Sequence, residues 1–161
     1  YTFAGEGVRL TLTFMTAALP EDLMVYSRPV TYVIYDLLAI DGQAHEIQAY
    51  FDASAEVTVN DPRDQQVRWS QSDIGTLAVA KMGSVDQPVL ERKGDDLRID
   101  WGYLYAAAPN SKTTSRWIAG RDVLQREFAR NALITSLSMP SPPANADVPA
   151  AALSRFFHRP A

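Results

Sequence analysis

Four acidic residues lie within or beside predicted strands and have the side-chain type that acid/base hydrolysis requires. They are Asp36, Asp52, Glu56 and Asp100. Such catalysis needs two carboxylates that lie close together, one placed to donate a proton and the other to accept one. Turn, edge-strand and surface roles account for most carboxylates in such positions, so catalysis by these residues is the less favoured interpretation.

Two histidines are further candidates for acid/base or metal chemistry. His45 and His158 lie far apart in the sequence, and no HExxH or comparable metal-binding spacing is present. His45 follows a predicted turn, where a histidine hydrogen-bonded near the turn is the favoured interpretation. The chain has no cysteine, which excludes a disulfide and a cysteine nucleophile. We therefore assign no catalytic, cofactor-binding or metal-ligating residue and expect no cofactor.

Aromatic residues provide a third kind of candidate site, a platform for a sugar ring. Trp101, Tyr103 and Tyr105 alternate along one predicted strand, and the chain also has Trp69 and Trp117. Such alternation is typical of a core or interdomain face, which we favour over a sugar-binding surface. The sequence has no GxSxG motif, phosphate-binding glycine loop or dinucleotide fingerprint.

The elements that position these residues are predicted to be short strands. Residues 8–15 alternate apolar and polar side chains, as a half-buried strand does. Residues 30–40 are apolar on both alternating sets, which predicts a central strand covered on both faces. Asp41-Gly42 predicts a tight hairpin turn, with positive φ at Gly42, that leads into a returning strand at 45–51.

Further strands are predicted downstream, and they determine the expected fold class. They cover residues 66–70, 74–80, 89–92 and 97–105, with a hairpin turn at 93–96. Many short strands joined by Gly, Pro and Asp turns favour an all-β fold over βαβ units. We predict a β-sandwich of antiparallel strands with a short helical or irregular C-terminal tail.

The C-terminal part of the sequence has the only helical pattern. Asp122 is predicted to cap a short helix, and Leu153, Phe156 and Phe157 have helical spacing near the chain end. We expect a sandwich domain at 1–137, from which N-terminal strands can be missing, and a Pro-rich linker and apolar tail at 138–161. The three apolar tail residues are expected to contact the sandwich or a neighbouring copy, which would allow self-association of the isolated fragment.

Composition restricts the class of protein. The chain has 161 residues, of which 47% are hydrophobic and 21% charged, and a net charge of −4. These values are typical of one folded domain, and the acidic charge disfavours a nucleic-acid partner. No stretch approaches the roughly 18 consecutive apolar residues of a membrane span, so we expect no membrane partner. Because the first residue is Tyr1, we expect the chain to be a piece of a longer protein.

Several runs resemble the N-terminal portion of the glutaminase A-like family of fungi and bacteria. The specific strings are Ser27-Arg-Pro-Val-Thr-Tyr32 and Tyr50-Phe-Asp-Ala-Ser-Ala-Glu56. The weaker matches follow the family's order from about residue 8 to about residue 135. They are Val8-Arg-Leu-Thr-Leu-Thr-Phe14, Asp41-Gly42 with His45, Trp101-Gly102, Gly120-Arg121-Asp122 and Phe128-Ala129.

The resemblance implies a large secreted or periplasmic protein that hydrolyses glutamine to glutamate and ammonia. It implies an N-terminal β-sandwich followed by an α-helical toroid, and no catalytic residue of the family maps onto this chain. The leading hypothesis is a non-catalytic accessory domain that packs against a helical catalytic domain of the same polypeptide. A carbohydrate-binding module with exposed Trp and Tyr is the alternative. A third hypothesis is an enzyme whose site lies on the sandwich and uses carboxylates such as Asp52 and Glu56.

Overall fold

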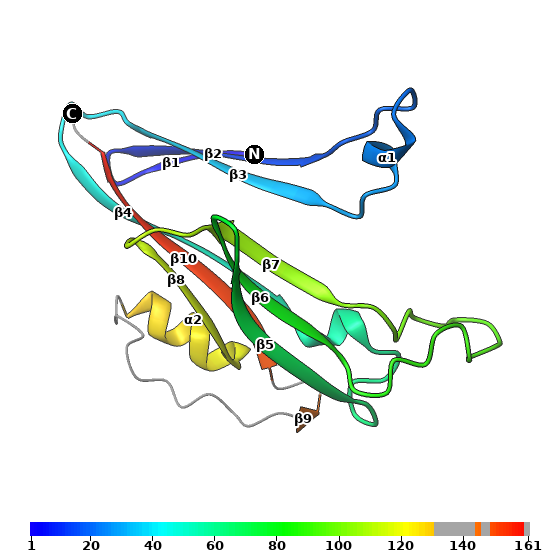
Figure 1. Cartoon of the computed structure of the whole chain (residues 1–161). Helices are drawn as coiled ribbons and strands as arrows, with labels where there is room; N and C mark the ends of the chain where they lie inside the picture. Colours follow the sequence, from blue (N-terminus) through cyan, green and yellow to red (C-terminus); the bar gives the residue numbers. More distant parts are fainter. Residues whose placement is uncertain (131–143, 146–148, 160–161) are drawn as a thin grey trace. The chain divides into compact units, whose positions relative to one another are not determined.

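A computed structural model describes residues 1–130, 144–145 and 149–159 of the chain. The chain divides into two compact units, one built mainly from Tyr1–Ala49 and the other from Tyr50–Arg155. The described residues form three sheets built from antiparallel strand pairs such as β1-β2, β2-β3 and β5-β6, so the predicted all-β fold is confirmed (Figure 1). No helix in the described part of the chain is long and apolar enough to cross a membrane.

The first unit contains a three-stranded sheet in the order β1-β2-β3. Its strands are β1 (Thr2–Gly5), β2 (Val8–Thr16) and β3 (Thr31–Ala39), and a short helix, α1 (Leu23–Tyr26), lies between β2 and β3. The predicted strand at 8–15 is thus confirmed as β2. Asp22 begins α1 by accepting hydrogen bonds from the backbone amides of Met24 and Val25.

The strand predicted at 30–40 exists as β3, but its predicted position in the centre of a sheet is wrong. β3 is an edge strand of its sheet in the described residues, and it pairs only with β2 there. Tyr32, Ile34 and Leu38 are about half exposed, whereas Leu37 is buried. Apolar residues on both faces of β3 therefore do not correspond to burial on both faces of this strand.

The predicted hairpin at Asp41-Gly42 is also wrong, although the turn itself exists. Gly42 has φ +73°, as expected, but β3 belongs to the first sheet and β4 (His45–Ser54) to a second one. The Asp41 carboxylate accepts a hydrogen bond from the Gln43 amide at 2.9 Å, which stabilises the turn locally. The turn is therefore a corner between two sheets.

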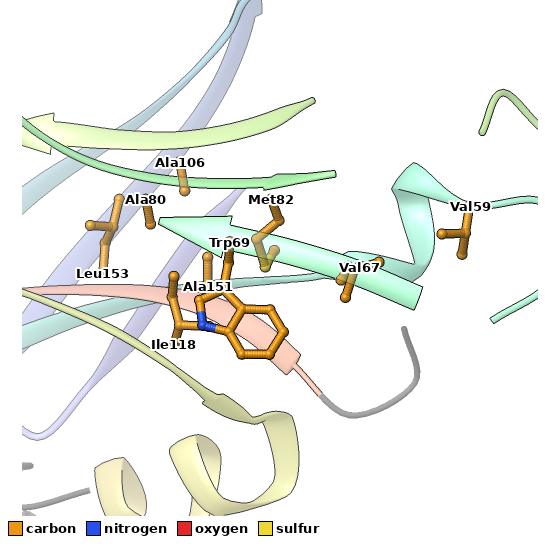
Figure 2. Close-up of a cluster of buried hydrophobic side chains, with 10 residues drawn as sticks. Val59, Val67, Trp69, Ala80, Met82, Ala106, Ile118, Ala151 and Leu153 are labelled. Carbon is orange, nitrogen blue, oxygen red and sulfur yellow. The ribbon is translucent and has the colours of Figure 1, made fainter. Parts of the chain in front are cut away.

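The second unit is a sandwich of two sheets. One sheet has the order β4-β10-β8 and the other β7-β6-β5-β9. Trp69 and Met82, from the latter sheet, share one buried cluster with Ile118, Ala151 and Leu153 from the former (Figure 2). The remaining elements are η1 (Ala55–Thr58), β5 (Gln66–Ile74), β6 (Leu77–Ser84), β7 (Leu104–Pro109), β8 (Thr114–Gly120), α2 (Arg121–Ala129), β9 (Ala144–Asn145) and β10 (Pro149–Arg159).

Helix α2 covers the sheet that contains β8. Leu124 of α2 is fully buried and shares a cluster with Ala119, Ala150 and Ala152. The helix was predicted to be capped by Asp122, but its N-cap is Gly120, and Asp122 lies in the first turn. An acidic residue at that position still interacts favourably with the helix dipole.

The C-terminal tail is a strand, which corrects the predicted helical or irregular tail. β10 pairs with β8 from Pro149↔Gly120 to Arg155↔Thr114, so its conformation is fixed by a distant partner. Leu153 is 8% exposed and belongs to the core, which confirms that this tail residue contacts the sandwich. Phe157 is half-buried, and the side chain of Phe156 lies outside the described residues, as do residues 138–143 and 146–148 of the predicted linker at 138–149. The domain boundary at residue 137 stays a prediction.

Three strand predictions in the middle of the chain, at 74–80, 89–92 and 97–105, need correction. The predicted strand at 74–80 contains the turn between β5 and β6, where Gly75 has φ +57°. Residues 85–103 form a loop without helix or strand, so the strands predicted at 89–92 and 97–103 and the hairpin between them are absent from it. Only the end of the last predicted strand is confirmed, as the start of β7 at Leu104.

Candidate functional site

The four acidic candidates lie in separate surroundings. Asp36 is exposed on β3 in the first unit, whereas Asp52, Glu56 and Asp100 belong to the second. Asp52 and Asp100 pair with different arginines, and Glu56 is exposed on η1. Among the described residues, no group of three or more histidine or acidic side chains is arranged to hold a metal ion.

Asp52 connects strand β4 with helix α2. Its carboxylate, 6% exposed, accepts a hydrogen bond from Nε of Arg121 at 2.9 Å and one from Nε2 of Gln125 at 2.8 Å. Tyr50, two residues earlier on the same face of β4, stacks on Phe128 of α2 with ring centroids 4.6 Å apart. Burial and the nearby Asp52 charge raise the pKa of Tyr50. The geometry of Asp52 thus indicates a structural role.

Asp100 belongs to a second, buried polar network. Its side chain is 4% exposed and accepts hydrogen bonds from Nε of Arg92 at 2.5 Å and Nε2 of Gln65 at 3.1 Å. Its backbone oxygen accepts a hydrogen bond from the Ser84 hydroxyl. The amide of Gln87 joins this network to Gly102 by donating to the Gly102 carbonyl and accepting from its N–H. These contacts tie both ends of the 85–103 loop to the sandwich.

Glu56 lines a polar hollow of about 440 Å³. The hollow contains carboxylates and guanidinium groups together, so it has no single sign of charge. Hydrogen bonds donated by Arg63, at 3.1 and 2.9 Å, hold the pKa of Asp61 down to about 2. An acid/base pair would require a carboxyl whose pKa is raised, and the shift at Asp61 is in the opposite direction. The residues around Glu56 are Asn60, Asp61, Pro62, Arg63, Asp96 and Arg98.

His45 lies in the corner between β3 and β4 and has a local structural partner. Its Nε2 is 2.9 Å from Oδ1 of Asp41, and this hydrogen bond is the main cause of the lowered pKa of Asp41. A Cβ at Gly7 would meet both of these side chains at less than 3 Å, so Gly7 makes room for the pair. The interpretation of His45 as a histidine hydrogen-bonded near the turn is confirmed. The side chain of His158 lies outside the described residues.

The aromatic candidates separate into buried and exposed residues. Trp69 is in the core at 8% exposure, whereas Tyr103 and Tyr105 are 48% and 53% exposed, so the core position of these two tyrosines is wrong and the interdomain alternative stays a prediction. The Lys81 ammonium lies 3.6 Å from the Tyr103 ring centroid. A Cβ at Gly83 would come within 2.4 Å of that ring, which therefore packs closely on Gly83. Trp101 and Trp117 are half-buried.

The β6–β7 loop, defined here as residues 85–103, is the feature that sequence reasoning missed. It has four exposed large apolar side chains, Val89, Leu90, Leu97 and Ile99. In the sequence these residues form two short apolar runs around Lys93-Gly94, a pattern that indicates a hairpin. Pro88, which directly precedes the first run, is the signal that could have argued against a strand there.

Comparisons with known proteins place the chain among glutaminase-related proteins. A family model described as "Domain of unknown function (DUF5127)" matches residues 1–159. A glutaminase A of Aspergillus oryzae is 28% identical over 138 residues, which cover 79% of this chain and 18% of that protein. A probable glutaminase of Arthroderma benhamiae is 28% identical over 138 residues, which cover 81% of this chain and 15% of that protein. The chain thus spans less than one fifth of the length of these relatives.

Proposed function

Because this chain belongs to the DUF5127 family, we propose that it is a non-catalytic accessory β-sandwich domain of a larger glutaminase-like hydrolase. In this proposal the domain packs against a helical catalytic domain of the same polypeptide, and the whole protein is secreted or periplasmic. The resemblance to the glutaminase A-like family, which the two fungal matches confirm, is the basis for the activity and the compartment.

The proposed accessory role rests on one observation: this chain matches only a small share of each relative's length. The aligned 138 residues account for 18% and 15% of the two fungal proteins. Their names therefore describe polypeptides of which more than four fifths lies outside the aligned region. A domain of this size that recurs within much longer chains is expected to fold around its own core and to serve the larger protein through its surface.

The local geometry of the carboxylates supports the same proposal. Asp52 and Asp100 are the acidic candidates with the least exposed side chains, and each holds an element of the fold in place through an arginine. Removing either is expected to lower stability first, because its arginine and amide partners would lose an acceptor that is largely buried. Glu56 is exposed and lies among arginines as well as acids.

Substitution in the parent polypeptide tests the proposal against catalysis on the sandwich. Glu56→Gln is suitable because Glu56 is exposed and its replacement is expected to leave the fold intact. The accessory role predicts a kcat for glutamine hydrolysis within about twofold of the wild type. A loss of about a hundredfold or more, the usual effect of removing a general acid or base, would support the enzyme hypothesis instead. Fractionation of cells that express the parent protein tests the compartment.

A carbohydrate-binding module is the second candidate function, because Tyr103 and Tyr105 are exposed. Their rings lie 6.3 Å apart at 68°, in an edge-to-face arrangement rather than a flat platform. Lys81 covers a face of Tyr103, which a sugar would need for stacking. Calorimetric titration with soluble polysaccharides distinguishes the candidates: the module predicts binding that Tyr105→Ala abolishes, and the accessory role predicts none.

A further inference from the structure

The β6–β7 loop exposes more apolar surface than its position at the end of a sandwich requires. Leu90 is 77% exposed, Ile99 64%, Val89 57% and Leu97 43%. Figure 1 shows this connection extending beyond the ends of β6 and β7. Loops of this length without helix or strand are uncommon and are usually either functional or disordered. Exposed apolar side chains that gather in one segment indicate an interaction surface.

Hydrogen bonds anchor the loop to the sandwich. Asp100, whose side chain is 4% exposed, accepts hydrogen bonds from Gln65 outside the loop and from Arg92 within it, and Ser84 of β6 donates to the Asp100 carbonyl. Gln87 bonds Gly102 across the loop and donates to the Ser84 carbonyl. We call these contacts the anchoring network. In addition, the backbone N–H of Arg98 donates a hydrogen bond to Oδ1 of Asn60 at 3.0 Å. Buried polar networks of this kind specify a single arrangement, because each group loses its partner if the loop shifts.

The backbone of the loop also holds unfavourable conformations. Gln87, Leu90 and Asp96 have φ of 48°, 56° and 58°, in the left-handed region that side chains other than glycine rarely adopt. Such residues persist only when surrounding contacts enforce them, and they gather at functional sites. The anchoring network therefore keeps Leu90 in a costly conformation that leaves its side chain exposed.

Between these side chains lies a hollow of about 160 Å³. Its apolar lining consists of Pro88, Leu90, Leu97, Ile99 and Trp101, and its charged lining consists of the Arg92–Asp100 pair and Arg98. A cavity of roughly 150 Å³ with apolar walls holds a benzene molecule. The hollow thus has room for one large apolar side chain of a partner.

The charges of the loop decide which class of partner fits. Within residues 85–103, five acids outnumber three cations, which are Arg92, Lys93 and Arg98. A nucleic acid or an anionic membrane surface would require an excess of cations, so a protein surface is the better match. The two fungal relatives place more than four fifths of their chain outside the aligned region. A partner in the same polypeptide benefits from high effective concentration, so a small apolar contact is sufficient.

We propose that the β6–β7 loop is the docking element by which this domain contacts the remainder of its own polypeptide, with one large apolar side chain of that remainder inserted into the hollow. The inference rests on the proposed function, since it names the surface through which the accessory domain meets the rest of the protein. The anchoring network preorganises Leu90 and Ile99 for this contact and so reduces the conformational entropy lost on docking.

Photo-cross-linking in the parent polypeptide tests the docking element. Leu90→Cys carries a benzophenone label, and Leu23→Cys in α1 is the matched control, because Leu23 is similarly exposed at 72%. The chain has no native cysteine that could compete for the label within residues 1–161. Mass spectrometry then identifies the peptide joined to each label. The expected result is a cross-link from position 90 to a segment outside residues 1–161 of the same molecule.

The outcomes separate the inference from the proposed function. A cross-link to the remainder from position 23 but not from position 90 overturns the loop as docking element and leaves the accessory role standing. Cross-links from neither position, together with no lysine-reactive cross-link between the two parts, contradict the packing of the accessory domain as well. A cross-link from position 90 to a second copy assigns the loop to a dimer and overturns the inference.

A second measurement does not depend on labelling. Leu90→Asp in the parent polypeptide is expected to lower its melting temperature by a few degrees, because the charge enters an apolar contact. Leu23→Asp is expected to leave the melting temperature unchanged. Equal shifts for the two variants contradict docking through the loop.

Discussion

The carboxylate of Asp52 on β4 accepts a hydrogen bond from Nε of Arg121, the first residue of α2, at 2.9 Å. Oδ2 of the same carboxylate accepts a second hydrogen bond, from Gln125 one turn later. Both strings that contain these residues, Tyr50–Glu56 and Gly120–Asp122, belong to the family resemblance. The contact thus gives a structural reason for two of the matched strings.

Asp52→Ala is expected to destabilise the domain by about 1–3 kcal/mol, because Arg121 and Gln125 lose a largely buried acceptor. Arg121 is half exposed and can turn to water, which keeps the loss below that of a fully buried pair. Urea unfolding measures the difference. Asp73→Ala is the matched control: Asp73 pairs with Arg116 but is 51% exposed, so its loss should cost less than about 1 kcal/mol. Equal losses would contradict the structural role of Asp52.

Tyr50 gives the domain a predicted sensitivity to alkaline pH. Burial and the Asp52 charge raise its pKa above the ordinary value of 10.0, so the folded state keeps a proton that the unfolded state releases. The stabilisation is complete below pH 10 and decreases as the pH rises above it. The slope is at most about 1.4 kcal/mol per pH unit and is reduced by solvent screening, because Tyr50 is half-buried. Urea unfolding between pH 8 and 11 should show a shallower decline for Tyr50→Phe, and an unchanged slope would contradict the argument.

Gly83→Ala is expected to destabilise the fold by about 1–3 kcal/mol. Its new Cβ would come within 2.4 Å of Cδ1 of Tyr103 and 2.8 Å of the Gly102 carbonyl oxygen. The aromatic ring can move, but the carbonyl belongs to the backbone of the anchored loop. Gly5→Ala serves as the control, since nothing lies within 4 Å of that Cβ. Equal melting temperatures for the two variants would show that Tyr103 does not pack on Gly83 as described.

Gly42→Val is expected to cost about 1 kcal/mol or more, through backbone conformation alone. Gly42 has φ +73°, and a Cβ there would meet no atom within 4 Å, so crowding is not a factor. Thermal unfolding measures the effect. An unchanged melting temperature would show that the corner at Asp41-Gly42 tolerates another conformation.

The elements that the sequence predicted correctly are those whose side-chain pattern depends only on their own residues. The alternation at 8–15 corresponds to β2, because local side chains alone determine which face is apolar. The positive φ of Gly42 was likewise predictable from turn chemistry. The pairing of the strand after that turn depends on distant residues, because β4 pairs with β10, near the other end of the chain.

Contacts between distant residues also explain the remaining errors. Two apolar runs around Lys93-Gly94 have the pattern of a hairpin, but Gln65 and Asn60 hold this segment as a loop from positions far back in the chain. β10 begins in an Ala-rich stretch that lacks strand-forming residues, and its pairing with β8 overrides that preference. The site was predicted only in part for the same reason, since the partners of Asp52 lie 69 and 73 residues away.

The proposed accessory role means that this domain assists a hydrolase without a catalytic centre of its own. Ammonia release from glutamine, measured on the purified chain and on the parent polypeptide under the same conditions, tests this role. We expect turnover by the parent and a rate for the chain alone that equals the uncatalysed rate. Turnover by the chain alone, well above the uncatalysed rate, would contradict the proposed role.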